Sequence, residues 1–210
     1  MSTPDPTTTS YAILGLLALR PWSTYELARQ MDRALGYFWP RTRSKLYEEP
    51  KKLVAAGLAT ASEELVGRRK RTVYSITPAG RRALAAWVKV PGGGPVLEFE
   101  QLVKVFFAEH GTKHDLLAGF AELRAWLVQR AEESQDIPHE YLEGRGPFPE
   151  RLPWLIVTAR FLDELDLAVE RWLDWAEATV AAWPDDLSQA EPDREVLVEM
   201  ARRVDRLLER

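Results

Sequence analysis

The feature that most constrains this chain is a basic hairpin pattern set between helical segments in its first 90 residues. In Leu58–Val66 and again in Thr72–Thr77, hydrophobic and polar residues alternate, as they do along a β-strand with one buried face. The residues between these segments, Gly67–Arg71, read Gly-Arg-Arg-Lys-Arg and predict a hairpin with a cationic tip. Elsewhere the hydrophobic spacing is helical, so the fold must combine several helices with one small sheet.

Three helical segments precede the hairpin. Tyr11–Arg20 is apolar almost all round, as in a helix buried inside a bundle, and Pro21 stops it. Thr24–Leu35 begins with the capping box Ser23–Glu26, in which the serine and glutamate side chains bond backbone N–H groups at the helix start. Thr42–Gly57 ends on a glycine, the residue type best suited to the left-handed conformation that closes many helices.

A fourth helical segment, Ala79–Val90, follows the hairpin, and Thr77 and Pro78 suit its cap and its first position. Three helices, a two-stranded hairpin and a further helix within residues 10–90 match the order of a winged helix-turn-helix domain. In such a domain the third helix enters the DNA major groove, and the hairpin, or wing, contacts the DNA backbone. We therefore predict a mainly α fold with this domain at the N-terminus.

The rest of the chain divides by composition. Residues 1–9 have no hydrophobic period and are expected to form a disordered arm, and residues 91–95, Pro-Gly-Gly-Gly-Pro, are expected to be a linker. Residues 96–210 show helical patterns with one apolar stripe each, interrupted at residues 137–153 by a proline- and glycine-rich segment that predicts a loop. Because a helix with one apolar stripe needs a partner surface, we expect residues 96–210 to form a helical dimerisation and effector domain.

The two parts of the chain have opposite net charge. Residues 1–90 contain 15 lysines and arginines and 7 aspartates and glutamates, a net charge of +8, whereas residues 91–210 contain 13 and 25, a net charge of −12. A basic domain joined to an acidic one fits a protein that binds a polyanion such as DNA through its N-terminal part.

The third helical segment holds the strongest candidates for DNA contact. At 100° per residue it has an apolar side suited to packing and a polar side suited to DNA. The apolar side comprises Leu46, Pro50, Leu53 and Gly57. Free backbone N–H groups and the helix dipole at the N-terminal end favour a phosphate, and basic residues cluster there. The candidate DNA-binding residues are Arg41, Thr42, Arg43, Ser44, Lys45, Tyr47 and Lys51. Tyr47 has an alternative role, packing against the hairpin at the edge of the core.

The predicted wing supplies a second group of candidates, Arg68, Arg69, Lys70 and Arg71. Four like charges so close together repel one another, and phosphates or counterions alongside them relieve the repulsion. A charged hairpin alone would usually be a solvated turn. In this chain, however, three helices precede the hairpin, as in a winged helix-turn-helix domain, and this order favours contact between the hairpin and DNA phosphates.

Several short stretches resemble PadR-type transcriptional regulators. They are Phe38-Trp39, Leu46-Tyr47, Leu53–Leu58 and Val73–Gly80. The resemblance covers residues 11–90, and the remainder is similar to the dimerising C-terminal domain of that family only in general pattern. It implies a cytoplasmic homodimeric regulator, often a repressor released by a small effector. Members usually carry Leu where this chain has Pro50 and Pro where it has Glu48, so the third helix is expected to be kinked or to start late.

The sequence therefore predicts a sequence-specific DNA-binding transcriptional regulator, a repressor that binds an inverted-repeat operator in double-stranded DNA as a homodimer. The alternative is a winged helix that serves as a protein-interaction module, in which the basic surface binds an acidic partner and no operator exists. An aromatic effector pocket between the helical region and the winged helix is a further hypothesis, although aromatic residues at helical spacing are more often core. Its candidate residues are Trp87, Trp126, Trp154, Trp172 and Trp175.

Other classes of function find little support in the sequence. The chain has no cysteine, which excludes disulfides and thiolate chemistry and fits a reducing cytoplasm. Its longest apolar stretch, Tyr11–Leu19, is far short of the roughly 20 residues of a membrane helix. No nucleophile elbow, phosphate-binding glycine loop or zinc-protease motif occurs, so we expect neither an enzyme nor a cofactor. His110 and His114 have the spacing of metal ligands on a helix, but Gly111 and Thr112 interrupt that helix, so no metal site is expected.

Overall fold

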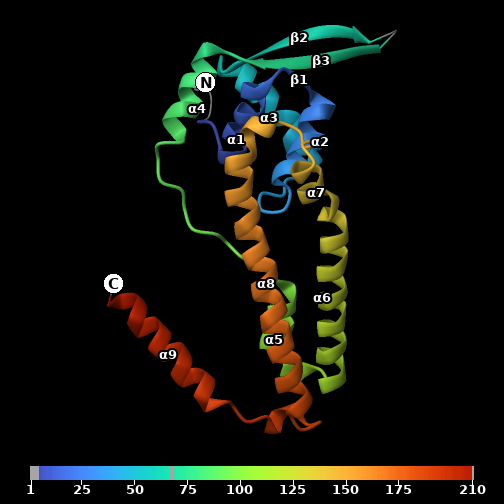
Figure 1. The fold of residues 1–210 in the computed structure, drawn as a ribbon, viewed down its shortest axis with the longest axis vertical. Helices are drawn as coiled ribbons and strands as arrows, with labels where there is room; N and C mark the ends of the chain where they lie inside the picture. Colours follow the sequence, from blue (N-terminus) through green and yellow to red (C-terminus); the bar gives the residue numbers. More distant parts are fainter. Residues whose placement is uncertain (1–4, 67–68, 210) are drawn as a thin grey trace. The chain divides into compact units, whose positions relative to one another are not determined.

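The computed structural model describes residues 5–66 and 69–209, with the backbone alone at Val66 and Arg69. It divides between Pro95 and Val96 into two compact units, each of which is described by itself. The first unit comprises α1 (Thr8–Leu19), β1 (Trp22–Ser23), α2 (Thr24–Leu35), α3 (Arg43–Ala55), β2 (Ala59–Val66), β3 (Arg69–Ile76) and α4 (Pro78–Trp87) (Figure 1). This order of elements confirms the predicted winged helix-turn-helix fold.

The core of the first unit forms around α1. Ile13, Leu14 and Leu17 of this helix are buried, as its all-round apolar sequence predicts. Neighbouring helices and strands contribute further buried side chains to the same unit: Leu27 and Met31 from α2, Leu46 and Leu53 from α3, and Val73 and Tyr74 from β3. Tyr74 is 4% exposed and belongs to this core, although tyrosine has a polar hydroxyl.

The disordered arm predicted over residues 1–9 is wrong at its last residues, because α1 already begins at Thr8. Thr7 caps α1, its Oγ1 accepting a hydrogen bond from the Ser10 backbone N–H at 3.2 Å, and the helix begins at Thr8. Thr9 and Ser10 are buried although both are polar. Ser10 Oγ donates to Glu49 Oε2 at 2.6 Å, a contact between α1 and α3 that the local sequence does not indicate.

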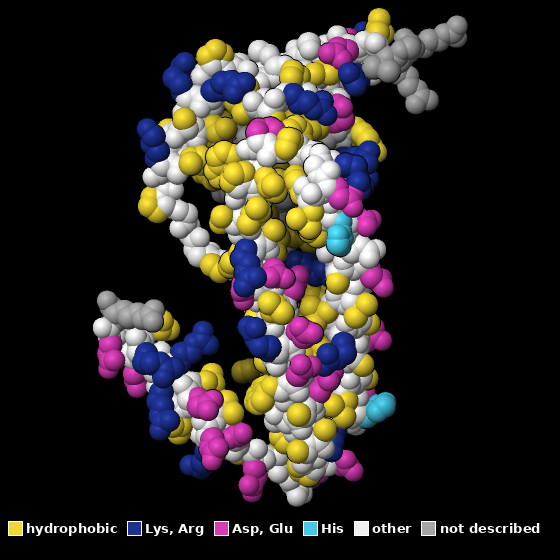
Figure 2. All heavy atoms as spheres, viewed as in Figure 1, with side chains coloured by type: hydrophobic (Ala, Val, Ile, Leu, Met, Phe, Trp, Pro, Cys, Tyr) yellow, Lys and Arg dark blue, Asp and Glu magenta, His cyan; other side chains and the backbone are white. Residues whose placement is uncertain are grey.

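The sheet of the first unit has three antiparallel strands in the order β1-β3-β2, one more than the predicted two-stranded hairpin. β2 and β3 pair from Ala59 with Ile76 to Val66 with Arg69, whereas β1 pairs only with Tyr74 and Val73. The hairpin therefore extends beyond the short strand β1 (Figure 1). Because β3 begins at Arg69, three residues of the predicted cationic tip, 69–71, belong to a strand. Figure 2 shows Lys and Arg side chains spread over the first unit, with Asp and Glu side chains close to those of the hairpin.

The second unit contains only helices among its described residues. They are α5 (Glu100–Phe106), η1 (Ala108–His110), α6 (Lys113–Ser134), α7 (Asp136–Leu142), η2 (Pro149–Arg151), α8 (Leu152–Ala182), η3 (Leu187–Gln189) and α9 (Arg194–Leu208). The loop predicted over residues 137–153 is wrong where α7 and η2 lie and at residues 152 and 153, which begin α8. Pro138 lies in the first turn of α7, where the missing proline N–H costs no intrahelical hydrogen bond.

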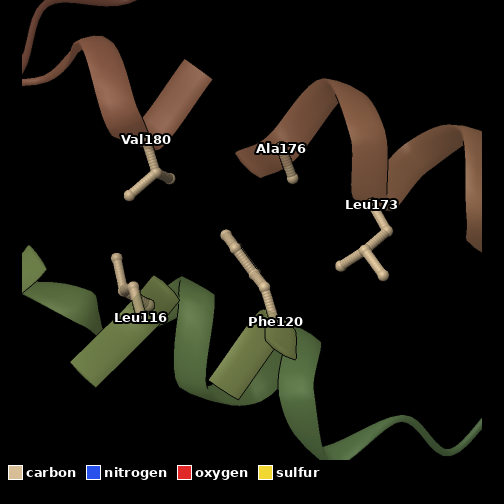
Figure 3. Packing of buried hydrophobic residues seen from close by; sticks show 5 residues of the cluster. All are labelled: Leu116, Phe120, Leu173, Ala176 and Val180. Carbon is tan, nitrogen blue, oxygen red and sulfur yellow. The ribbon is translucent and has the colours of Figure 1, made fainter. Parts of the chain in front are cut away.

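The long helices α6 and α8 pack against each other. Their buried side chains face one another in Figure 3: Leu116 and Phe120 from α6, and Leu173, Ala176 and Val180 from α8. The Trp172 ring packs edge-on against Phe120, with ring centroids 5.7 Å apart. Ion pairs continue the contact along the helices, where Arg124 bonds Asp174 and Glu177 and Arg130 bonds Asp166.

The helix α9 is amphipathic, but none of its residues is buried. Its exposed hydrophobic side chains are Leu197, Val198, Met200, Val204, Leu207 and Leu208. Over the described part of the chain, no helix combines the length and the apolar character needed to cross a membrane.

Candidate nucleic-acid interface

The helix α3 has one buried and one exposed face, as its sequence predicts. Leu46, Pro50 and Leu53 are buried against the first unit. The exposed residues include Arg43, Ser44, Lys45 and Lys51, and Tyr47 is half-buried. Pro50 does not interrupt α3, which runs without a break from Arg43 to Ala55 and does not start late. The exposed side chains thus share one continuous helical surface.

Glu49 is a buried carboxylate on α3 that sequence reasoning missed. It is 5% exposed and accepts hydrogen bonds from Ser10 Oγ at 2.6 Å and Lys52 Nζ at 2.7 Å. Burial alone would raise the pKa of Glu49, but the hydrogen bonds from Lys52 and Ser10 outweigh it and lower that pKa below its usual range. The spacing of three residues between Glu49 and Lys52 could have indicated this partner from the sequence. The other partner, Ser10, is 39 residues away and could not have been found in that way. Glu49 therefore fixes the orientation of α3 on α1.

We expect Glu49→Gln to lower the free energy of unfolding at pH 7 by about 1–3 kcal/mol, because it removes a buried, charge-assisted hydrogen bond. The folded-state pKa lies below the ordinary value of 4.5, so ionised Glu49 stabilises the fold above about pH 4.5. That stabilisation is lost as the pH falls through the lowered pKa. Urea titrations at neutral and acid pH should therefore show the difference between variant and parent shrinking in acid.

The control for this prediction is Glu48→Gln. Glu48 is the preceding residue of the same helix and is exposed, so its substitution should change the free energy of unfolding by less than about 0.5 kcal/mol. Equal losses for the two variants would show that the buried contact with Ser10 has no special weight.

The N-terminal end of α3 is open to an external anion. Its N-cap residue, Thr42, makes no side-chain hydrogen bond to the helix backbone, and its hydroxyl lies 3.2 Å from Ser44 Oγ. Within the described residues, Arg43, Lys45 and Lys51 have no ion-pair partner. Unpaired N–H groups, the positive end of the helix dipole and nearby cations together favour a phosphate at this position.

Arg41, the first of the candidate residues, is engaged inside the first unit. Its guanidinium lies over the Trp39 ring at 4.0 Å, Nε donates to Thr9 Oγ1 at 3.3 Å, and Nη1 donates to the Pro40 carbonyl at 2.6 Å. Trp39 Nε1 donates to the same threonine hydroxyl at 3.1 Å. Arg41 therefore anchors the segment that leads into α3, a role that its basic character alone did not indicate.

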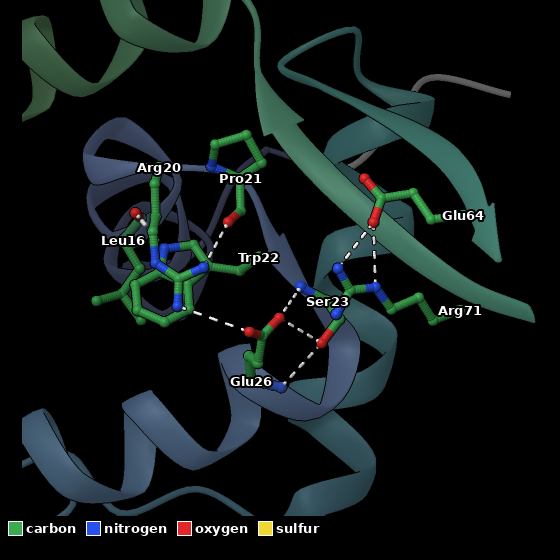
Figure 4. A network of polar contacts seen from close by, with 8 residues as sticks. All are labelled: Leu16, Arg20, Pro21, Trp22, Ser23, Glu26, Glu64 and Arg71. Carbon is green, nitrogen blue, oxygen red and sulfur yellow. Dashed lines mark hydrogen bonds and ion pairs between the residues drawn. The ribbon is translucent and has the colours of Figure 1, made fainter. Parts of the chain in front are cut away.

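Two of the four cations of the wing, Lys70 and Arg71, are paired with carboxylates that sequence reasoning left out. Lys70 Nζ lies 2.9 Å from Glu63 Oε2. Arg71 Nη2 lies 2.8 Å from Glu64 Oε2, the pair shown in Figure 4. The prediction that phosphates or counterions relieve the repulsion between these cations did not include these carboxylates, which also offset the charges of Lys70 and Arg71. These partners follow from the strand register, in which Glu64 lies directly opposite Arg71. Arg68 lies outside the described residues, and the side chain of Arg69 is not described.

The five tryptophans proposed as an effector pocket are divided between the two units. Trp87 is in the first unit, where its ring stacks on Tyr11 at 4.9 Å, and the other four are in the second. Trp172 packs against Phe120 and Phe99 in the core. The remaining three, Trp126, Trp154 and Trp175, are exposed.

The second unit also has an open groove of about 510 Å³ between α5, η1 and α6, and none of the five tryptophans lines it. His110 lies beside this groove, its Nε2 3.7 Å from Glu109 Oε1. The described residues contain no group of three or more His, Cys, Asp or Glu side chains that could hold a metal ion.

Comparison with known proteins connects this geometry to a family. Residues 13–86 match the model of the Transcriptional regulator PadR-like family. Over 183 residues the chain is 38% identical to "Probable transcriptional regulator Rv1176c" of Mycobacterium tuberculosis, an alignment that covers 73% of this chain and 97% of that protein. The "Negative transcriptional regulator PadR" of Bacillus subtilis is 34% identical over 79 residues, which are 37% of this chain and 43% of that protein.

Crystal structures of Bacillus subtilis PadR have a similar fold. The structure in complex with operator DNA has a TM-score of 0.67 and 24% identity, and the match covers 83% of this chain and 99% of that chain. The structure in complex with p-coumaric acid has a TM-score of 0.61 and 25% identity, with the same coverage.

Proposed function

The chain belongs to the PadR-like family of transcriptional regulators, and from this membership we propose that it is a homodimeric repressor that binds an inverted-repeat operator through α3 and the wing. The observation that carries the proposal is the exposed end of α3. Its cations have no partner within the described part of the chain, and the opposite face of the helix is buried in the first unit. This is the arrangement of a recognition helix, in which one face packs and the other enters the major groove.

The candidate residues divide into two roles in this proposal. Arg43 and Lys45, with Thr42 beside them, contact phosphates at the N-terminal end of α3, and the wing residues Arg68–Arg71 contact phosphates farther along the duplex. The other three candidates on the exposed face of α3 contact base edges: Ser44, Tyr47 and Lys51. Arg41 does not contact DNA in this proposal; its contacts with Trp39 and Thr9 hold the segment before α3 in place.

The homodimer and the effector rest on other observations. The exposed apolar stripe of α9 needs a partner surface, and a second copy of the chain would supply one. Repression is proposed because the related protein from Bacillus subtilis is named a negative regulator. A small aromatic effector is proposed because Bacillus subtilis PadR has been crystallised with p-coumaric acid. Exposed tryptophans of the second unit are candidates to contact such a ligand.

Selection of binding sites from random double-stranded DNA tests the proposal. We expect the chain to enrich an inverted repeat and to bind it about 1000-fold or more tightly than random duplex. Ser44→Ala and Tyr47→Ala should change which base pairs are enriched, because these residues face the bases. Tyr25→Ala, at an exposed tyrosine of α2, is the control and should leave the enriched sequence unchanged. Enrichment of no sequence would favour the protein-interaction module instead.

A further inference from the structure

Two glutamates of β2 lie beside two of the cations that the wing would offer to DNA. Glu64 is directly opposite Arg71 in the strand register, and its Oε2 accepts hydrogen bonds from Arg71 Nη2 at 2.8 Å and Nε at 3.1 Å (Figure 4). Glu63, opposite Thr72, reaches diagonally to Lys70 Nζ at 2.9 Å. All four side chains are between 45% and 71% exposed. Because successive residues of a strand point to opposite faces, the two pairs lie on opposite faces of the hairpin, and each face carries one cation with its carboxylate.

These pairs change the charge that the wing presents. Residues 63–71 contain four basic side chains and two carboxylates, a net charge of +2 instead of the +4 of the basic run alone. The Arg71 guanidinium donates two hydrogen bonds, from Nε and Nη2, to the same oxygen of Glu64, so two of the donors that could bind a phosphate point at a carboxylate. Exposed ion pairs are weak, so a phosphate can displace the carboxylates. The displaced carboxylates stay on the neighbouring strand, however, and repel the phosphate.

We propose that Glu63 and Glu64 limit the affinity of the wing for the DNA backbone, so that the wing holds DNA firmly only when α3 is also engaged. This inference rests on the proposed function, because it concerns the same interface. Binding to non-specific duplex is almost entirely electrostatic, so neutralised wing cations weaken it most directly. With weaker wing contacts, a larger share of the affinity for DNA comes from the contacts of α3. The two glutamates act through Lys70 and Arg71 and need not touch DNA.

The test is a salt titration of the double variant Glu63→Gln/Glu64→Gln with a fluorescently labelled random-sequence duplex, followed by anisotropy. Two further phosphates neutralised by each chain should steepen the slope of log K against log[salt] by up to ~1.8. The affinity at ~0.1 M salt should rise about threefold or more. The matched control is Glu132→Gln/Glu133→Gln, which makes the same change in net charge at two adjacent exposed glutamates of α6. The control should change neither slope nor affinity.

A second comparison asks whether the glutamates act through their partners. In a background carrying Lys70→Ala and Arg71→Ala, the same two glutamine substitutions should alter the salt slope much less, because the two cations that pair with the glutamates are gone. An increase in affinity below threefold, or an equal increase in the α6 control, overturns the inference while the parent chain still binds DNA. A parent chain that binds no duplex at all removes the proposed function itself, so the two failures are distinguishable.

Discussion

Replacing Arg43 and Lys45 together by alanine should lower the affinity for duplex DNA by about 60-fold per chain at ~0.1 M salt. Each phosphate neutralised by a cation contributes about −0.9 to the slope of log K against log[salt], so two lost contacts should flatten the slope by ~1.8. Both side chains are exposed at the open N-terminal end of α3, so their removal should not disturb the core. The measurement is an anisotropy titration at several salt concentrations, on both selected and random duplex.

The matched control for this prediction is Lys104→Ala/Arg145→Ala. These are also one exposed lysine and one exposed arginine, but they lie in the second unit, paired with Glu100 and Glu143. The control makes the same change in net charge and should leave the slope unchanged. If both double variants lose affinity equally, binding reflects overall charge and α3 is not the reading helix.

Replacing Phe120 by alanine should lower the free energy of unfolding of the second unit by about 3–5 kcal/mol. Phe120 is 0% exposed and lies between α6 and α8, where it contacts Trp172 edge to face. The substitution removes a large buried apolar surface and leaves a cavity that the two helices cannot close without losing their other contacts. Denaturant unfolding followed by circular dichroism measures the loss, and tryptophan fluorescence reports on the neighbouring Trp172.

Phe106→Ala provides the comparison, because Phe106 lies on α5 of the same unit and is 78% exposed. Its removal should cost less than about 0.5 kcal/mol, as expected for a surface substitution. Were the two variants to lose stability equally, the packing of α6 against α8 would not be the main source of stability in this unit.

The helices of the first unit could be predicted closely because their signals are local. Ser23 and Glu26 stand three residues apart, and both hydrogen bonds of the capping box form, with Ser23 N–H donating to Glu26 Oε2 at 2.9 Å and Glu26 N–H donating to Ser23 Oγ at 3.3 Å (Figure 4). The helix α2 accordingly has the predicted bounds, Thr24–Leu35. Gly57 takes a φ of +70°, as the predicted left-handed helix end requires.

The errors arose where a polar residue found a distant partner. Residues 8 and 9 are threonines with no hydrophobic period, which predicts disorder, yet Thr9 is buried and accepts hydrogen bonds from Trp39 and Arg41. The sequence shows that the basic residues of the wing are contiguous, but it does not show which charges lie beside them. The carboxylate partners, Glu63 and Glu64, lie on the other strand and become neighbours only through the register.

The amino-acid sequence by itself determined the order of the four helices and the β2–β3 hairpin of the first unit, and which face of α3 is buried. Periodicity, caps and breakers act over three or four residues and need no knowledge of the rest of the chain. Only the tertiary structure decided which charges are available to a ligand. The Ser10–Glu49 contact spans 39 residues, and the Lys70–Glu63 contact depends on how two strands are aligned. Electrostatic partners depend on distance in space, and folding sets that distance.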